Sequence, residues 1–544
     1  MSARGARVPA GWLGLVAFTS VLTAIWLVVQ PRTPDLAAQL YRVSLFRTQG
    51  FVVWDDNWYA GHYIPGYSLL YPPLASLVGL RLLGALCVMA STLLFWRAAD
   101  AVYGRRAGWA GLWFAVAALG EVWSGQMTFA LGVPLALAAG LALIRERWLA
   151  AGALAALCAA ASPVAGALLG LAGLTVTLSR RSPRALLTLA GPAVVVVLAG
   201  VALFPEGGYE PYPFWSFAAT IVVVLAFLWA LPSRERLLRI GGCVYLLACV
   251  GCAAVHSPIG SNVERYGVLL AGPLMLCALL SGGDARTDGV STGRSRTGVL
   301  GRIGPVGALA LCLAAGWVLW GPIRETRAVA GSEATSASYY APVKRFLAQQ
   351  HGGPVRVEVP LTRSHWEAAL LAPSVALARG WEKQMETRYD DVLLAGALTA
   401  ASYERWLHQQ AVSYVALPDL PLDSSSKQEG RLIRGGLPYL REVFATTHWR
   451  IYRVLGATPL ASGPGTLEAL GHDSFSLSAR RAGSFVVRVR YTPYWTLTRG
   501  SGCVARASGG WTVVSVRAPG EAVVRARFSL SRAFSSGASC SPGA

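Results

Sequence analysis

Four side chains that can accept or donate a proton lie close together near the start of the chain. Asp35, Asp55, Asp56 and His62 fall within residues 34–73, PDLAAQLYRVSLFRTQGFVVWDDNWYAGHYIPGYSLLYPP. A carboxylate can accept the proton of a hydroxyl group while that hydroxyl attacks a carbon atom. The segment is long, aromatic and acidic, so it predicts a site of general acid–base chemistry rather than a simple tether.

Asp35 is the first choice for the general base, and it also fits a structural role. Pro34-Asp35 followed by LAAQLYRVSLF is a typical helix start, in which an acid near the first turn caps the helix. The two roles are compatible, because the positive end of a helix dipole keeps a carboxylate ionised.

The doublet Asp55-Asp56 has several readings. It can supply a second catalytic acid, a pair of ligands for a divalent metal, or hydrogen bonds to an acceptor sugar. The neighbouring Trp58 and Tyr59 favour the sugar interpretation, because pyranose rings stack on aromatic faces. The alternatives are structural: D-D-N is a typical turn sequence, and Trp and Tyr are common at membrane interfaces. His62 can bind a phosphate, but we expect it to order the loop.

The composition indicates what must position these residues. The chain has 544 residues, of which 54% are hydrophobic and 14% charged, and a mean hydropathy of +0.46, which exceeds that of a soluble protein of this size. The apolar runs end near Trp320. They predict a polytopic α-helical membrane domain with about eleven spans, at residues 12–30, 76–97, 107–123, 127–144, 148–161, 164–179, 185–204, 215–231, 240–256, 265–281 and 304–321.

Three domains are predicted. Residues 1–325 form the membrane domain, with a large outer loop at 31–75. Residues 326–456 alternate between strand and helix patterns, which indicates an α/β domain. Residues 457–544 alternate with a period of two, which indicates a β-sandwich. The α/β domain is expected to contain strands at 355–359, 413–417 and 449–454, and helices at 366–378, 400–410 and 430–444.

Loop charges predict the orientation in the membrane. Arginines concentrate in alternate short loops, and the formal net charge is +20. The positive-inside rule then places the N-terminus in the cytoplasm and, with an odd number of spans, the tail outside the plasma membrane. The tail has no basic stripe or RNA-binding signature, so nucleic acid is excluded as a partner.

The same topology gathers further polar residues on the outer side. Glu121 and Gln126 flank a turn between spans, and Asn262 precedes Arg265 at the start of a late span. An arginine at that depth is costly unless it is paired. Arg265 therefore predicts either a phosphate contact or an ion pair with Glu264 or a loop acid.

In the tail, Cys503 and Cys540 are the only cysteines, and they are expected to form a disulfide if the tail is exported. The polar–aromatic clusters 365–367 and 379–382 suit carbohydrate contact, but we expect them to serve packing.

The first outer loop resembles that of C-type-fold glycosyltransferases, membrane enzymes that take sugar from a polyprenyl-phosphate carrier. The similarity rests on Pro34-Asp35-Leu36, Gly50-Phe51-Val52, Trp54 to Tyr59, and Pro72-Pro73-Leu74. The segment is also similar to a set of actinobacterial membrane proteins that share the motifs WY-x-GH and YSLL-x-PPLA and are often labelled as transporters. The sequence departs from the family at the first acid, where Leu36 stands in place of a second acid.

The resemblance implies a glycosyltransferase that moves a hexose or pentose, with inversion, from a polyprenyl-phosphate donor to a cell-envelope glycan or glycolipid. Asp35 would be the base, Arg265 would contact the donor phosphate and Asp55 would position the acceptor. The alternatives are a transporter or flippase, which would need ionisable residues at mid-membrane, and a non-catalytic envelope scaffold.

Overall fold

The computed structural model of the protein describes residues 10–104, 107–281, 303–394 and 396–534. Its contacts divide the chain into two compact units. The membrane unit comprises Met1–Pro31, Ser68–Leu198 and Tyr209–Arg327, and the tail unit comprises Arg32–Tyr67, Ala199–Gly208 and Ala328–Ala544. Two segments counted above with the membrane domain belong to the tail unit: most of the first outer loop, Arg32–Tyr67, and the shorter Ala199–Gly208.

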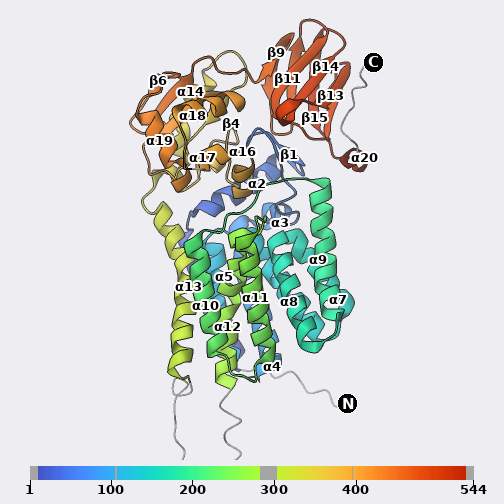
Figure 1. Ribbon diagram of the computed structural model, residues 1–544, viewed down its shortest axis with the longest axis vertical. Helices are drawn as coiled ribbons and strands as arrows, with labels where there is room; N and C mark the ends of the chain where they lie inside the picture. The colour runs from blue at the N-terminus through green and yellow to red at the C-terminus, as the bar shows by residue number, and fades with distance from the viewer. Residues whose placement is uncertain (1–9, 105–106, 282–302, 395, 535–544) are drawn as a thin grey trace, which may run out of the picture. The chain divides into compact units, whose positions relative to one another are not determined.

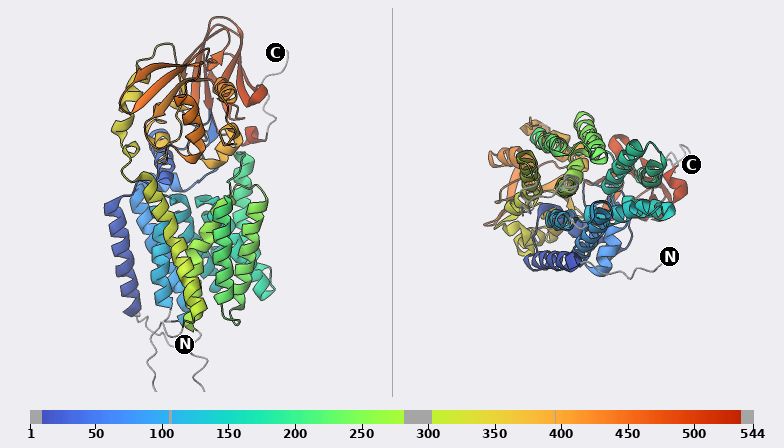
Figure 2. Two further views of the ribbon diagram at one scale, coloured as in Figure 1. Left: turned by 60° about the vertical axis from the view of Figure 1, so that its left-hand side comes forward. Right: turned by 90° about the horizontal axis from the view of Figure 1, so that it is seen from below.

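The membrane unit is a bundle of helices that run side by side (Figures 1 and 2). Within the described ranges, eight helices are long and apolar enough to cross a membrane: α1 (Ala10–Val29), α4 (Leu80–Tyr103), α6 (Met127–Ile144), α8 (Pro163–Arg180), α9 (Arg184–Leu203), α11 (Arg236–Ala254), α12 (Glu264–Ser281) and α13 (Pro305–Val329). Three apolar helices are shorter: α5 (Ala107–Trp123), α7 (Trp148–Ala161) and α10 (Phe214–Ala230). The chain is thus a multi-pass membrane protein, and each predicted span corresponds to a helix. The number of crossings stays a prediction.

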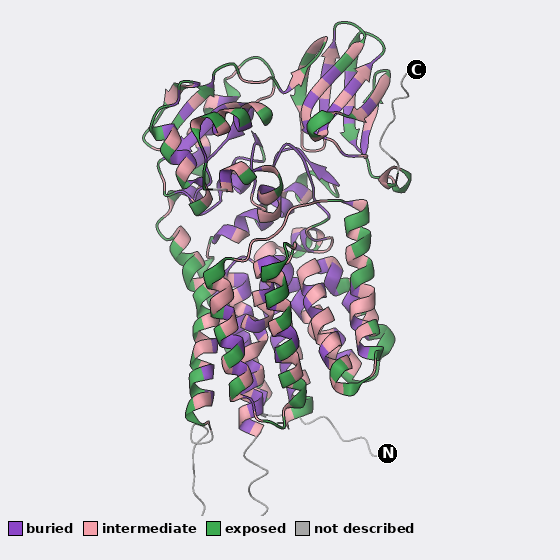
Figure 3. Cartoon of the chain, in the orientation of Figure 1, coloured by how far each residue is buried: buried purple, intermediate pink, exposed green. Residues whose placement is uncertain are grey.

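Apolar side chains on the outside of the bundle fit a lipid environment. Only 11% of the most apolar stretch of α9 is buried, and Val194, Val195 and Leu198 are exposed on it. Figure 3 shows exposed and half-buried residues along the same helix. In water such a surface would be costly, whereas in a bilayer apolar residues on the outer face are expected.

The predicted second span begins later than its sequence suggested. Pro72 and Pro73 lie in a short separate helix, α3 (Tyr71–Val78), which ends at Gly79. Gly79 has a φ of 95°, a conformation that favours glycine, and α4 starts directly after it. The break explains why the apolar run from residue 76 is not one helix.

The first part of the tail unit is an α/β domain, as predicted. Its five-stranded sheet has the order β4-β3-β5-β7-β6, in which β3 is parallel to β4 and β5, and β7 is antiparallel to β5 and β6. The strands are β3 (Arg356–Glu358), β4 (Ala376–Leu377), β5 (Val412–Pro418), β6 (Leu440–Ala445) and β7 (Trp449–Val454). The helices are α14 (Ala337–Ala348), α15 (Glu367–Leu370), α16 (Lys383–Tyr389), α17 (Asp391–Leu394), α18 (Ala400–Gln409) and α19 (Lys427–Arg434), with 3-10 turns η4 (Glu333–Thr335) and η5 (Ser424–Ser426).

Two predicted helices of this domain are wrong. The range 366–378 contains only the single turn α15 and then the strand β4, because Pro373 interrupts the helical hydrogen bonds. The range 430–444 contains the end of α19 and then the strand β6. The helix ends at Gly435-Gly436, and the second glycine has a φ of 84°, after which the chain turns and pairs with β7.

The second part of the tail unit is the predicted β-sandwich. Two four-stranded antiparallel sheets have the orders β12-β15-β10-β9 and β13-β14-β11-β8. Buried and less buried residues alternate along β10, as a strand with one core face requires. The strands are β8 (Ala461–Ser462), β9 (Gly465–Leu470), β10 (Ser474–Ala479), β11 (Gly483–Arg490), β12 (Trp495–Arg499), β13 (Gly502–Arg506), β14 (Trp511–Val516) and β15 (Gly520–Ala526), followed by α20 (Leu530–Ala533).

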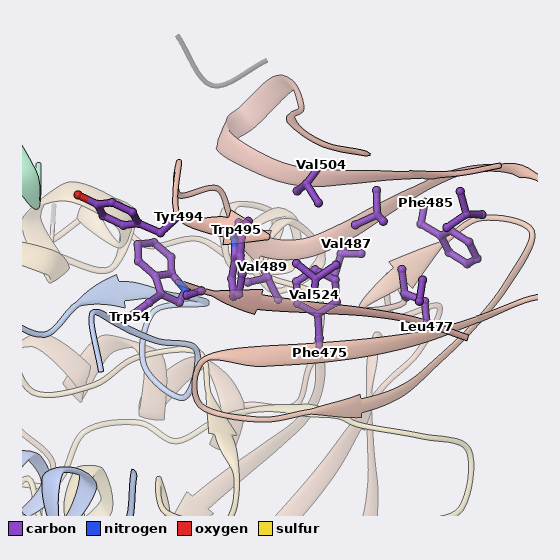
Figure 4. Packing of buried hydrophobic residues seen from close by; sticks show 14 of the residues in the cluster. Trp54, Phe475, Leu477, Phe485, Val487, Val489, Tyr494, Trp495, Val504 and Val524 are labelled. Carbon is purple, nitrogen blue, oxygen red and sulfur yellow. The ribbon is translucent and has the colours of Figure 1, made fainter. Parts of the chain in front are cut away.

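The core of the sandwich includes side chains from the first outer loop. Figure 4 shows Trp54 beside Tyr494 and Trp495, at one end of the cluster formed by Phe475 and the sheet residues. Trp54 packs edge-on to Trp495, with their ring centroids 6.1 Å apart. Phe204, which follows α9, belongs to the same cluster. The loop is therefore part of the tail's hydrophobic core.

Cys503 lies on β13 and is disulfide-bonded. Its predicted partner, Cys540, lies outside the described residues. The seven cysteines of the apolar helices are free thiols.

Candidate active site

Helix α2 (Pro34–Gln49) carries the predicted base. Pro34 stands at its first position, Asp35 lies in the first turn, and the helix ends at Gly50, whose N–H donates to the carbonyl of Phe46. The expected helix start is thus confirmed, but the N-cap residue is Thr33 and not Asp35. Asp35 is half-buried, where the positive end of the helix stabilises its carboxylate.

Two further polar residues share the helix face of Asp35. Gln39 and Arg42 follow it by four and seven residues, a spacing that places all three on one side of a helix. Gln39 and Arg42 are only 1% and 2% exposed. A buried glutamine and a buried arginine need polar partners, because each unpaired buried group costs roughly 1–3 kcal/mol.

The polar atoms of Gln39 and Arg42 are only partly hydrogen-bonded among the described residues. The Nη2 atom of Arg42 donates to the carboxylate of Glu382, and the guanidinium lies 3.8 Å from the ring centroid of Tyr67. The Nε and Nη1 atoms of Arg42, and the Oε1 atom of Gln39, have no hydrogen-bond partner in the part of the chain that the structure describes. The Nε2 atom of Gln39 donates to the hydroxyl of Tyr67 over 3.0 Å.

We call Gln39, Arg42, Tyr67 and Glu382 the α2 cluster. Its arginine presents two donors that a phosphate or carboxylate oxygen can accept from. Reasoning from the sequence missed this cluster. The spacing of Gln39 and Arg42 from Asp35 was the one available signal, whereas Glu382 follows Arg42 by 340 residues, so no local pattern joins them.

The predicted loop residues form a second cluster, fully inside the tail unit. Strands β1 (Trp54–Asp55) and β2 (His62–Tyr63) pair as a small hairpin, whose turn holds Tyr59 and Ala60 at φ values of 56° and 63°. Asp55 and Asp56 are both 0% exposed. Among the described residues, neither carboxylate is accessible to solvent.

Asp55 accepts hydrogen bonds through both oxygens. Oδ2 accepts from the hydroxyl of Tyr41 over 2.8 Å, and Oδ1 lies 3.0 Å from Nδ1 of His472 and accepts from the N–H of Asn57. The hydroxyl of Tyr41 remains protonated, because burial raises its pKa well above the ordinary value and the charge of Asp55 adds to that effect. Asp55 thus connects α2, the hairpin and the sandwich loop at His472.

Asp56 has a different environment. Its Oδ1 accepts from Nε1 of Trp54 over 2.7 Å, and its N–H donates to the carbonyl of His472 over 2.6 Å. Oδ2 has no partner among the described residues. Burial raises the pKa of the Asp56 carboxyl well above its ordinary value, so the protonated form is favoured at this position.

Trp58, Tyr59 and His62 hold the hairpin in place. Trp58 is stacked between Tyr41, at 4.4 Å, and His62, at 5.5 Å, and its Nε1 donates to the carbonyl of Ala368. The hydroxyl of Tyr59 donates to the carbonyl of Glu382. Burial lowers the pKa of His62, so its ring is neutral. These contacts agree with the ordering role expected for His62.

The remaining predicted site residues belong to the membrane unit. Glu121 is buried at the end of α5, and Arg265 lies in the first turn of α12. The guanidinium of Arg265 lies 5.4 Å from the ring of Phe129. Glu264 does not serve as its ion-pair partner, since that carboxylate accepts from Ser216 and Thr220.

Gln126 follows Glu121 in the chain, and Asn262 precedes Arg265. Gln126 precedes α6, and its N–H donates to the carbonyl of Glu121 over 3.0 Å. Asn262 lies in the 3-10 turn η2 (Gly260–Val263) just before α12. Within the described ranges, no group of three or more His, Cys, Asp or Glu side chains is arranged to hold a metal ion.

The predicted packing role of the tail clusters fits their contacts. The ring of His365 stacks on Trp381 with centroids 3.4 Å apart. Arg379 is buried and forms ion pairs with Glu358 and with Glu429, the latter at 2.6 Å. Glu382, from the same stretch, is the exception, because it binds Arg42.

No protein-family model matches the sequence. No curated protein matches it. Among solved structures, the protein is similar to ArnT from Cupriavidus metallidurans bound to undecaprenyl phosphate, with 15% identity, a TM-score of 0.43, and coverage of 83% of this chain and 100% of that one. The apo state of the same ArnT gives 15% identity and a TM-score of 0.41, with coverage of 81% and 97%. Likeness of this degree does not assign the chain to a family.

Proposed function

We propose that the protein is a membrane glycosyltransferase that transfers a sugar from a polyprenyl-phosphate carrier to a cell-envelope acceptor. The observation that supports this most is the polar face of α2, where the carboxylate of Asp35 precedes a buried arginine with two unpaired donors. A base and a phosphate-binding cation on one rigid helix are what such a transfer requires.

The proposed step runs as follows. The acceptor hydroxyl attacks the anomeric carbon while its proton passes to the carboxylate of Asp35. The bond between that carbon and the phosphate oxygen breaks, and the phosphate leaves with the electron pair, still attached to its lipid. Arg42 stabilises the negative charge that develops on this phosphate. Arg265 of the membrane unit, which the family resemblance associates with the carrier phosphate, stays a separate proposal from the sequence.

The buried hairpin has a supporting part in this proposal. The polar side-chain atoms of Asp55, Trp58 and Tyr59 are hydrogen-bonded within the tail unit, so we assign these residues to positioning α2 and Glu382 and not to substrate contact. The arginine pattern of the loops supports a cytoplasmic N-terminus and a reaction on the outer side.

The test uses a deletion strain of the host. Loss of the gene should cause an under-glycosylated envelope acceptor to accumulate, and the wild-type gene should restore it. Asp35→Asn should lower transfer by about 100-fold or more, because a positioned general base contributes roughly 10²–10⁴-fold. Glu333→Gln, which removes an exposed acid from η4, is the matched control and should restore the acceptor fully.

The burial of the hairpin acids favours one second candidate, a non-catalytic envelope scaffold. A scaffold predicts that Asp35→Asn complements the deletion as well as Glu333→Gln does. That result, with normal amounts of folded protein, would remove Asp35 from any reaction and favour the scaffold.

A further inference from the structure

A cavity of about 400 Å³ lies within the tail unit, where the α/β domain meets the β-sandwich. Its walls come from α16, α17 and α18 on one side, and from the end of β11 and the 3-10 turn η6 (Ser508–Gly510) on the other. The volume is at the small end of the range for ligand pockets, roughly 300–1,000 Å³. It suits a ligand of one or two sugar rings in size.

Positive charge dominates the lining. Arg388, Arg405 and Arg490 face the cavity, against the single carboxylate of Asp391. Neither Arg388 nor Arg405 forms an ion pair with a carboxylate in the described residues, and both are exposed at the surface. Three guanidinium groups with one acid among them attract an anionic ligand, which arginine can bind through two parallel hydrogen bonds.

Arg490 is the fixed part of the site. It is 8% exposed, its Nε donates to the carbonyl of Tyr59 over 2.8 Å, and its Nη2 donates to Oε1 of Gln410 over 3.3 Å. Its guanidinium lies over the ring of Tyr389, 3.4 Å from the ring centroid. A cation held in one orientation loses little entropy when it binds an anion.

One other lining group suits the hydroxyls of a sugar. Gln409 on α18 faces the same cavity as the arginines, and an amide side chain can both donate and accept hydrogen bonds. Ser402 also lines the cavity, but its hydroxyl is bonded to Thr399 in the capping box of α18. The aromatic rings of the lining are occupied, since Tyr389 is covered by Arg490 and Trp406 stacks on Tyr403. Polar recognition, rather than ring stacking, therefore selects the ligand.

We propose that this cavity binds an anionic saccharide, that is, a sugar bearing a carboxylate or a phosphate group. The site goes beyond the proposed transfer reaction and does not depend on it. Arg490 also connects the cavity to the hairpin through Tyr59, whose hydroxyl contacts Glu382 of the α2 cluster.

The test measures binding to the full-length protein in detergent by isothermal titration calorimetry. The probes are glucuronate and glucose 1-phosphate, with glucose and inorganic phosphate as comparisons. At least one anionic sugar should bind 10-fold or more tightly than both comparisons, and the tighter of the two identifies the anionic group. Its affinity should fall with added salt, because the contacts are charged.

Arg405→Gln should weaken that binding by about 10-fold, since Arg405 is exposed and its loss leaves the fold intact. The matched control is Arg441→Gln, an exposed arginine on β6 outside the cavity, which should bind like the wild type. The proposal is overturned if neither anionic sugar binds at millimolar concentration, if glucose or inorganic phosphate binds equally well, or if Arg405→Gln leaves the affinity unchanged. Loss of sugar transfer in the Asp35→Asn variant would leave this binding unaltered.

Discussion

At the scale of single residues, Asp55 and Asp56 are adjacent and equally buried, yet their carboxylates have different hydrogen-bond partners. Asp55 has a tyrosine hydroxyl, a histidine and a backbone N–H around its two oxygens. Asp56 has one indole N–H, and its second oxygen has no partner among the described residues. Burial of a carboxylate without enough donors favours the neutral acid.

We therefore expect Asp56→Asn to stabilise the protein at pH 7. The raised pKa of Asp56 means that the folded state holds a proton which the unfolded chain releases above about pH 4. The stabilising effect of this bound proton is present below about pH 4, and it is lost as the pH rises through the folded-state pKa of Asp56. Asparagine imitates the protonated form and keeps the bond from Trp54, so the melting temperature should rise at pH 7 and change little near pH 4.

Asp55→Asn serves as the contrast. Its loss of charge weakens the contacts with Tyr41 and His472, so the free energy of unfolding should fall by roughly 1–3 kcal/mol. Scanning fluorimetry of both variants across this pH range checks the pair. Equal destabilisation by the two substitutions at pH 7 would contradict the different roles assigned to the carboxylates.

At the scale of elements, one of the contacts between the hairpin and the α/β domain leaves no room for an added side chain. The backbone of Gly380 lies directly against the indole of Trp58, and a Cβ atom placed there would be 2.4 Å from Trp58 Cγ. Trp58 is 0% exposed and stacked on both sides, so it cannot move aside.

Gly380→Ala should consequently destabilise the tail unit by roughly 1–3 kcal/mol, the usual cost of overpacking a core. The change should also reduce any activity that depends on α2, since Glu382 follows two residues later. Gly66→Ala is the matched control, because its nearest neighbour is a side-chain atom of Glu206 at 4.0 Å. A melting temperature for Gly380→Ala equal to that of the control would show that the contact has room to relax.

The elements also show what the sequence could predict. Apolar runs of membrane length and period-2 strands are local patterns, so the helices of the membrane unit and the strands of the sandwich followed from them. The helices expected at 366–378 and 430–444 failed because Pro373 and Gly436 redirect the chain within otherwise helical patterns. The start of α2 was predictable from Pro34 and Asp35, but its partner Glu382 was not, since that pairing depends on the fold of a distant domain.

At the scale of the whole molecule, the tail is built from three separate parts of the chain. Val53, Trp54 and Tyr63 from the first outer loop, and Phe204 after α9, are buried with the sandwich residues in one cluster. Removing a buried aromatic residue of this size usually costs about 3–5 kcal/mol. The tail sequence alone therefore lacks part of its own core.

This arrangement predicts that an isolated fragment of residues 328–544 is poorly stable. Without the loop, apolar surface around Phe475 and Trp495 is exposed, so the fragment should aggregate or melt over a broad range. Joining residues 32–67 to its N-terminus through a flexible linker should restore a sharper and higher transition, measured by scanning calorimetry. A fusion carrying Trp54→Ala is the matched control and should gain little. Identical melting of the fragment and the fusion would contradict the shared core.

The most direct test of the central claim concerns Arg42. Undecaprenyl phosphate should be titrated into full-length wild-type protein and two variants, Arg42→Gln and Arg47→Gln, with binding followed by native mass spectrometry. Both arginines are on α2, but Arg47 is exposed, so it controls for loss of charge on the helix. The account predicts that Arg42→Gln weakens binding about 10-fold or more while Arg47→Gln binds like the wild type. Equal affinities for all three proteins would contradict the proposal that the polar face of α2 holds the carrier phosphate.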